Sequence, residues 1–119
     1  MENLSGMETK NLTLVASRRV IGGAGFKDPP DAEGMVEIAY GVVPAHQNNG
    51  YATEAAEALV SYAVKSGRVR TIRAHTLPQP NASTRVLTKC GFRRVGEVTD
   101  PEDGLVWRWE KSKVLQREF

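Results

Sequence analysis

Cysteine and histidine are both scarce in this chain. Its 119 residues include one cysteine and two histidines. A single cysteine cannot form an internal disulfide, so nothing suggests an oxidising compartment. No pair of potential ligands has the spacing of a metal site. We therefore expect a cytoplasmic protein that holds no metal.

Long apolar runs and an excess of one charge are also missing. No apolar stretch approaches the roughly 18 residues that cross a bilayer, and the polar N-terminus does not resemble a signal peptide. The net charge is only +2, and the basic residues fall in scattered pairs rather than in one block. We expect neither a membrane nor a nucleic acid as partner.

The remaining composition is that of an ordinary globular domain. Hydrophobic residues make up 40% of the chain and charged residues 25%. The length allows one hydrophobic core but not two. We therefore expect a single domain over residues 1–119, with residues 1–11 and 111–119 as flexible tails.

Apolar periodicity and turn residues predict an α+β fold of six strands and two helices. The strands are expected at residues 12–17, 20–26, 36–43, 70–76, 93–99 and 105–110, and the helices at 51–66 and from the N-cap Asn81 to about Lys89. The first three strands should form an antiparallel meander. The strand, helix and strand over residues 36–76 should form a parallel pair with a right-handed crossover.

The strand at residues 36–43 is apolar on both faces, so we expect it to be covered on both sides. Glu37 is the exception in this strand. It is either a glutamate at the strand end that reaches water or a general base that takes a proton from an amine.

A polar turn with a glycine, residues 46–50, joins this strand to the first helix. The first turn of a helix has unpaired N–H groups and a partial positive charge, so it can bind an anion. Gly50 has no Cβ and would let a phosphate approach the backbone. The alternative is an ordinary turn between a strand and a helix.

Two motifs here resemble those of one enzyme family. Gln47-x-x-Gly50-x-Ala52 resembles the acetyl-CoA pyrophosphate motif of the GNAT superfamily of N-acetyltransferases. The segment from Asn81 to Phe92 is similar to a second motif of the subgroup that includes the ribosomal-protein N-terminal acetyltransferases. The resemblance covers roughly residues 20–110.

The resemblance implies a GNAT-like fold, with a mixed sheet of about six strands and two helices. It also implies an N-acetyltransferase that moves an acetyl group from acetyl-CoA to a primary amine, either a protein N-terminus or a small molecule. The implied contacts with acetyl-CoA are Val42, Val43, Gln47, Asn48, Asn49, Gly50, Tyr51, Ala52, Thr53 and Asn81.

The same resemblance suggests the catalytic residues. Glu37 is the candidate base, and Ser83 is the candidate donor of a proton to the leaving thiolate. The alternative for Ser83 is a hydroxyl that caps the second helix. Cys90 is expected to fill the core rather than to act as a nucleophile.

The sequence departs from the family pattern at its N-terminal side. A full GNAT domain begins with a strand and two helices that wall the acceptor site, and this sequence resembles the family only after them. We therefore expect a shortened domain that covers its sheet by forming a homodimer. The alternatives to an active enzyme are a non-catalytic module that binds acyl-CoA and a small interaction domain.

Overall fold

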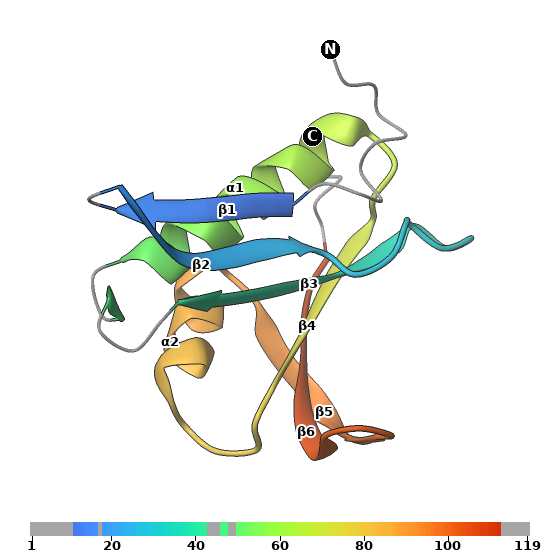
Figure 1. Ribbon diagram of the computed structural model, residues 1–119. Helices are drawn as coiled ribbons and strands as arrows, with labels where there is room; N and C mark the ends of the chain where they lie inside the picture. The colour runs from blue at the N-terminus through green and yellow to red at the C-terminus, as the bar shows by residue number, and fades with distance from the viewer. Residues whose placement is uncertain (1–10, 17, 43–45, 48–49, 113–119) are drawn as a thin grey trace.

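The computed structural model describes residues 11–16, 18–42, 46–47 and 50–112 (Figure 1). All the predicted elements are present, and each begins and ends within one residue of its predicted bounds. They are β1 (Asn11–Ala16), β2 (Arg19–Phe26), β3 (Met35–Val42), α1 (Tyr51–Ser66), β4 (Thr71–Thr76), α2 (Ala82–Lys89), β5 (Arg93–Asp100) and β6 (Gly104–Lys111).

The assignment of Asn11 and Lys111 to flexible tails is wrong, because these two residues belong to β1 and β6. Each pairs with a neighbouring strand, Asn11 with Gly25 and Lys111 with Ile72. The rest of both predicted tails, apart from Ser112, lies outside the described residues.

The six strands form one mixed sheet in the order β1-β2-β3-β4-β6-β5. The first three strands form the predicted antiparallel meander, and β3 and β4 form the predicted parallel pair. The hairpin of β5 and β6 joins the sheet through β6, which pairs with β4.

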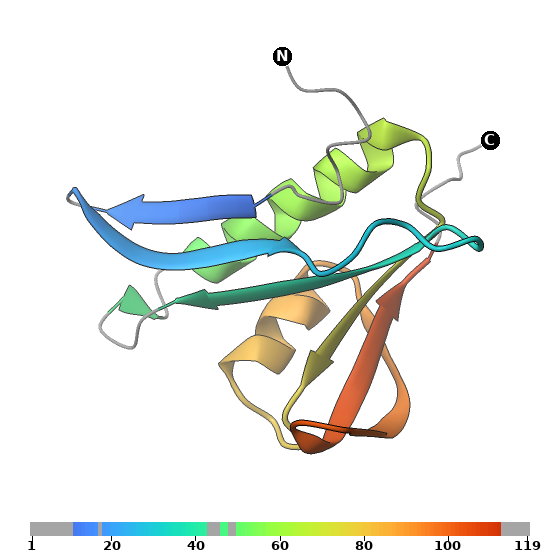
Figure 2. The same cartoon turned by 45° about the vertical axis from the view of Figure 1, so that its right-hand side comes forward.

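The strands β3 and β4 diverge after a short paired segment. Their pairing runs from Met35 opposite Thr71 to Glu37 opposite Arg73. Beyond this point β3 continues alongside β2, whereas β4 continues alongside β6. The two halves of the sheet therefore separate in a V, which Figure 2 shows from the side.

Helix α1 buries an apolar stripe along one side. Ala55, Ala56, Leu59 and Ala63 are buried, and small alanine side chains let the helix lie close to the sheet. Gly67 ends the helix with φ 71°, the left-handed conformation that favours glycine. In the part of the chain that the structure describes, no helix is long and apolar enough to cross a membrane.

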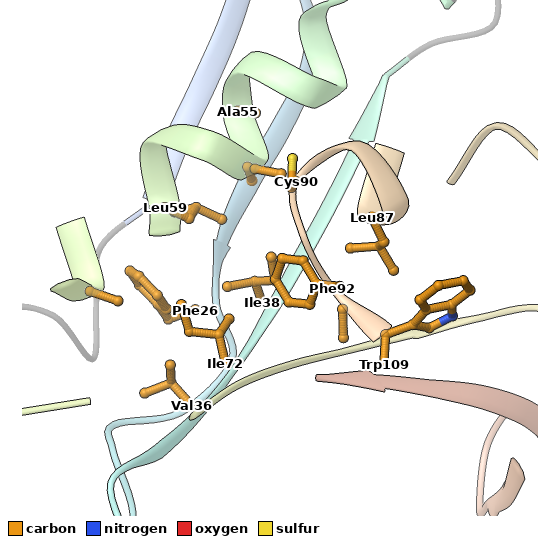
Figure 3. Close-up of a cluster of buried hydrophobic side chains, with 14 of the residues drawn as sticks. Phe26, Val36, Ile38, Ala55, Leu59, Ile72, Leu87, Cys90, Phe92 and Trp109 are labelled. Atoms are coloured by element: carbon orange, nitrogen blue, oxygen red, sulfur yellow. The ribbon is translucent and has the colours of Figure 1, made fainter. Parts of the chain in front are cut away.

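Both helices cover the same face of the sheet. One buried cluster joins Leu59 of α1 and Leu87 of α2 to side chains from the strands (Figure 3). The strand and connecting residues in this cluster include Phe26, Val36, Ile38, Ile72, Phe92 and Trp109. Cys90 is also buried there, as predicted.

The prediction that β3 is covered on both sides is wrong. Val36 and Ile38 face the helices and are buried, but Ala39 and Gly41 are exposed on the opposite face. Both helices lie on one side of the sheet. Alanine and glycine count as apolar in a sequence pattern, but they are small enough to remain exposed to solvent. The opposite face, called here the open face, therefore exposes much of β3.

Candidate active site

Helix α1 begins at Gly50, which has φ 85°. Only glycine adopts this conformation without strain. The helix leaves the N–H groups of its first turn without partners inside the helix, and these carry its partial positive charge. A Cβ added at Gly50 would meet no atom within 4 Å, so the backbone there faces open space.

A cavity of about 330 Å³ lies in front of this helix start, between the end of β3 and helix α2. Its volume is in the usual range for small-molecule sites. The cavity brings together seven of the residues predicted to act in the site, from four segments of the chain. They are Val42, Gln47, Gly50, Tyr51, Ala52, Thr53 and Ser83.

The other predicted residues fall into two groups. Val43, Asn48 and Asn49 are outside the described residues. Glu37 and Asn81 are described but are not among the residues that line the cavity. Their predicted roles stay predictions.

The side chain of Gln47 forms a hydrogen bond with the end of β3. Its Nε2 donates to the carbonyl oxygen of Val42 at 2.8 Å. This bond links Gln47, three residues before the N-cap Gly50, to the end of β3. It also uses a strand carbonyl at the point where β3 has already left β4.

Tyr40 and Ser83 bridge β3 and α2 on the wall of the cavity. Their hydroxyl oxygens are 3.0 Å apart, and either can be the donor. Burial raises the pKa of the Tyr40 phenol, although the hydrogen bond with Ser83 partly opposes this. The phenol therefore keeps its proton at neutral pH. Tyr40 and Ser83 are thus both protonated hydroxyl groups beside the cavity.

The interpretation of Ser83 as the capping hydroxyl of α2 is wrong. The N-cap is Asn81, whose Oδ1 accepts from the Thr84 N–H at 2.9 Å, while the Thr84 hydroxyl accepts from the Asn81 N–H at 3.0 Å. This reciprocal capping box starts the helix without Ser83. The Ser83 hydroxyl is thus left to the cavity and to Tyr40.

Two basic residues of α2, Arg85 and Lys89, also line the cavity, and sequence reasoning missed them. They are one helical turn apart, so their charges lie on one side of the helix. The sequence could have indicated them through the spacing of four residues that lie on one face of the helix, namely Ala82, Arg85, Val86 and Lys89. Tyr40, Gly41 and His46 are further lining residues that were not predicted.

Glu37 lies where the V begins, on the open face of the sheet. Its Oε2 is 2.7 Å from Nδ1 of His75 and 3.5 Å from Nζ of Lys27. The side chain is half-buried. A carboxylate in this position can accept a proton from a group that approaches the apex of the V.

Comparison with known proteins shows the family of this chain. The sequence model of the GNAT acetyltransferase domain matches residues 3–93. The chain belongs to the GNAT acetyltransferase family. The match spans β1 to α2 and so includes every element that lines the cavity.

Among curated proteins, the chain is 36% identical over 73 residues to the uncharacterized N-acetyltransferase YjdG of Bacillus subtilis. The match covers 61% of this chain and 44% of YjdG. The chain therefore spans less than half the length of this relative.

Among solved structures, the chain is similar to a GNAT-family acetyltransferase from Bacillus anthracis, with a TM-score of 0.72 and 28% identity. The match covers 87% of this chain and 66% of that one. The acetyltransferase yncA from Salmonella typhimurium, solved with its cofactor acetyl-CoA, has a TM-score of 0.67 and 24% identity, covering 78% of this chain and 58% of that one. The second likeness concerns the fold alone.

Proposed function

We propose that this GNAT domain transfers an acetyl group from acetyl-CoA to a primary amine, either a protein N-terminus or a small molecule. The observation that supports this most is the cavity. It is lined both by the start of α1, where Gly50 is the N-cap, and by the end of β3, where β3 no longer pairs with β4. An anionic group and an extended chain would each find the backbone donors and acceptors they need there.

The pyrophosphate would bind the N–H groups of residues 50–53, and Arg85 and Lys89 would add positive charge from the opposite wall. The pantetheine arm would enter the V and hydrogen-bond to the free edge of β3 near Val42. Asn48 and Asn49 would complete the turn around the phosphates, and Val43 the strand edge. Any contact from Asn81 would use its amide nitrogen, because its oxygen caps α2.

The chemistry would be direct acyl transfer. Glu37 takes a proton from the ammonium group, and the neutral amine attacks the thioester carbonyl. The resulting oxyanion is stabilised by a backbone N–H of β3 near Val42. Ser83 gives its proton to the departing thiolate, while the Tyr40 hydroxyl, 3.0 Å away, holds the serine oxygen in place. The second proton that the attacking nitrogen loses passes to solvent, and solvent restores the proton of Ser83.

The test is release of free thiol from acetyl-CoA, measured over a panel of amines and N-terminal peptides. On a confirmed acceptor, Glu37→Gln should lower kcat by about two to four orders of magnitude and leave acetyl-CoA affinity nearly unchanged. Glu33→Gln is the matched control, because Glu33 is exposed in the loop before β3. A near-parental rate for Glu37→Gln would remove the base from the proposal.

The second candidate is a module that binds acyl-CoA without catalysis. It is favoured by one observation, namely that Glu37 is not among the residues that line the cavity. Tight binding of acetyl-CoA without thiol release on any amine would support this function over the first. Absence of binding would contradict both.

The domain is also proposed to form a homodimer. The strand β1 stands at one end of the described sheet, and the β1–β2 hairpin exposes Val15 and Val20, at 58% and 68% of their surface. Proteins rarely leave such an edge open, and a second copy could pair with it symmetrically.

A further inference from the structure

Glu37 and His75 form a contact across the apex of the V. The last parallel pair joins Glu37 to Arg73, so His75 is the next residue of β4 whose side chain points to the open face. Its Nδ1 is 2.7 Å from Oε2 of Glu37. Only 21% of the His75 side chain and 23% of the Glu37 side chain are exposed, so the contact is partly protected from water.

Arg108 of β6 completes this contact from the far side of the imidazole. It is paired with His75 in the sheet, and its Nε donates to Nε2 of His75 at 3.1 Å. A guanidinium group has donors only, so Nε2 must be the acceptor and has no hydrogen. The ring hydrogen is therefore on Nδ1, where it is donated to Glu37.

Among the charged groups described near Glu37 on this face, His75 makes the shortest contact with its carboxylate. Arg73 sits opposite Glu37 in the register, but its guanidinium is held by Glu110, with distances of 2.9 and 2.7 Å to Oε2. Lys27 is further away, 3.5 Å from Glu37, and its side chain is half exposed. The pKa of Asp100 is lowered mainly by hydrogen bonds from the backbone N–H groups of Asp103 and Glu102. The charges of Lys27 and His75 lower it further.

The geometry points to His75 as a positioning residue for Glu37, in a tautomer fixed by Arg108, and this rests on the proposed function of Glu37 as base. Oε2 is held by the imidazole N–H, and Oε1 receives the proton of the substrate ammonium. The bond from nitrogen to hydrogen breaks, its electron pair stays on nitrogen, and the hydrogen bonds to Oε1. An orienting hydrogen bond of this kind keeps the base in one rotamer.

The tautomer can be measured without any activity. The chain has two histidines, so a ¹⁵N spectrum of the full chain shows two imidazoles, and the His46→Gln variant identifies His75. We expect a protonated Nδ1 and an unprotonated Nε2 for His75. Arg108→Met should remove this preference, and Lys27→Met should not. A hydrogen on Nε2 of His75 in the parent protein would overturn the inference.

The positioning role is tested on a confirmed acceptor by two substitutions. His75→Leu removes the donor and should lower kcat by about 10- to 100-fold, the usual effect of losing an orienting partner. His75→Asn has an amide N–H close to the place of Nδ1 and should recover most of the rate. The KM for acetyl-CoA should stay the same in both variants.

Equal losses in the two His75 variants, or an unchanged rate in His75→Leu, would overturn the positioning role. If the parent chain acetylates no amine, the proposed function fails, and the role in positioning a base fails with it. The ¹⁵N spectrum still decides the tautomer in that case, so the two failures can be told apart.

Discussion

Gly50 and Gly67 flank α1 in the same left-handed conformation, with φ of 85° and 71°. A Cβ at either position would meet no neighbouring atom, so alanine at each should introduce the same backbone strain, about 1 kcal/mol. Only Gly50 lines the cavity. Gly50→Ala should therefore also weaken acetyl-CoA binding by about tenfold, roughly the effect of one lost hydrogen bond to a charged group.

Urea unfolding and calorimetric titration of the two variants measure these effects. Gly67→Ala is the matched control, because it shares the strain and lies at the other end of the helix. Equal acetyl-CoA affinity for Gly50→Ala and the parent would show that the phosphates do not bind at this turn.

Tyr40 makes a second prediction at this scale, which concerns alkaline pH. Burial raises the pKa of its phenol, so the folded state favours the protonated form. The stability linked to this group is complete below the pKa of an unfolded tyrosine and is lost as pH rises above it. The parent protein should therefore lose more stability between neutral pH and about pH 11 than Tyr40→Phe does.

Urea unfolding at several pH values measures this difference. Burial also raises the pKa of the Cys90 thiol, but that group is present in both proteins and its effect cancels. The same pH dependence in the parent and in Tyr40→Phe would contradict the prediction.

At the scale of elements, α2 presents Ser83, Arg85 and Lys89 to the cavity, and its start depends on the capping box of Asn81 and Thr84. Asn81→Ala should lower the free energy of unfolding by about 1 kcal/mol. Asn81→Asp keeps an oxygen that can accept from Thr84, so it should keep the stability. The aspartate lacks the amide N–H group, so it should still weaken acetyl-CoA binding if Asn81 contacts the pantetheine arm.

Thermal unfolding and calorimetric titration of both variants test this separation. If Asn81→Asp binds acetyl-CoA as tightly as the parent, Asn81 serves the helix alone.

The local elements could be predicted because their signals lie within short segments. Alternating apolar residues marked the strands, and Gly50 and Gly67 marked the ends of α1. The site was harder because it depends on strand order. The hairpin of β5 and β6 could join β4 by either strand, and nothing in the sequence shows that β6 does so. The contact of Arg108 with His75 follows only from that choice.

The exposed face of the sheet was missed for a related reason. Ala39 and Gly41 count as apolar in a sequence pattern, yet they are small enough to stay exposed. Likewise, Arg85 and Lys89 lie in a helix whose apolar residues could be found, but the cavity opposite them is made by β3 and the start of α1. Such a site forms only when distant segments meet.

At the scale of the whole molecule, the edge strand β1 and the exposed Val15 and Val20 predict self-association. Sedimentation at micromolar concentration should show a species of twice the 13.1 kDa chain mass. Val15→Lys should shift the species toward the monomer, because a charge on the edge opposes pairing between strands. Arg93→Lys, on β5 at the other edge, is the control. A single 13.1 kDa species at all concentrations would contradict the dimer.

The central claim concerns the cavity between β3, the start of α1 and α2, and a crystal structure grown with acetyl-CoA tests it most directly. We predict the pyrophosphate on the N–H groups at Gly50 to Thr53, within reach of Arg85 or Lys89. We also predict the pantetheine arm along the free edge of β3, with its thioester toward the apex near Glu37. Acetyl-CoA bound at another surface, or no bound acetyl-CoA in crystals grown at saturating concentration, would contradict the claim.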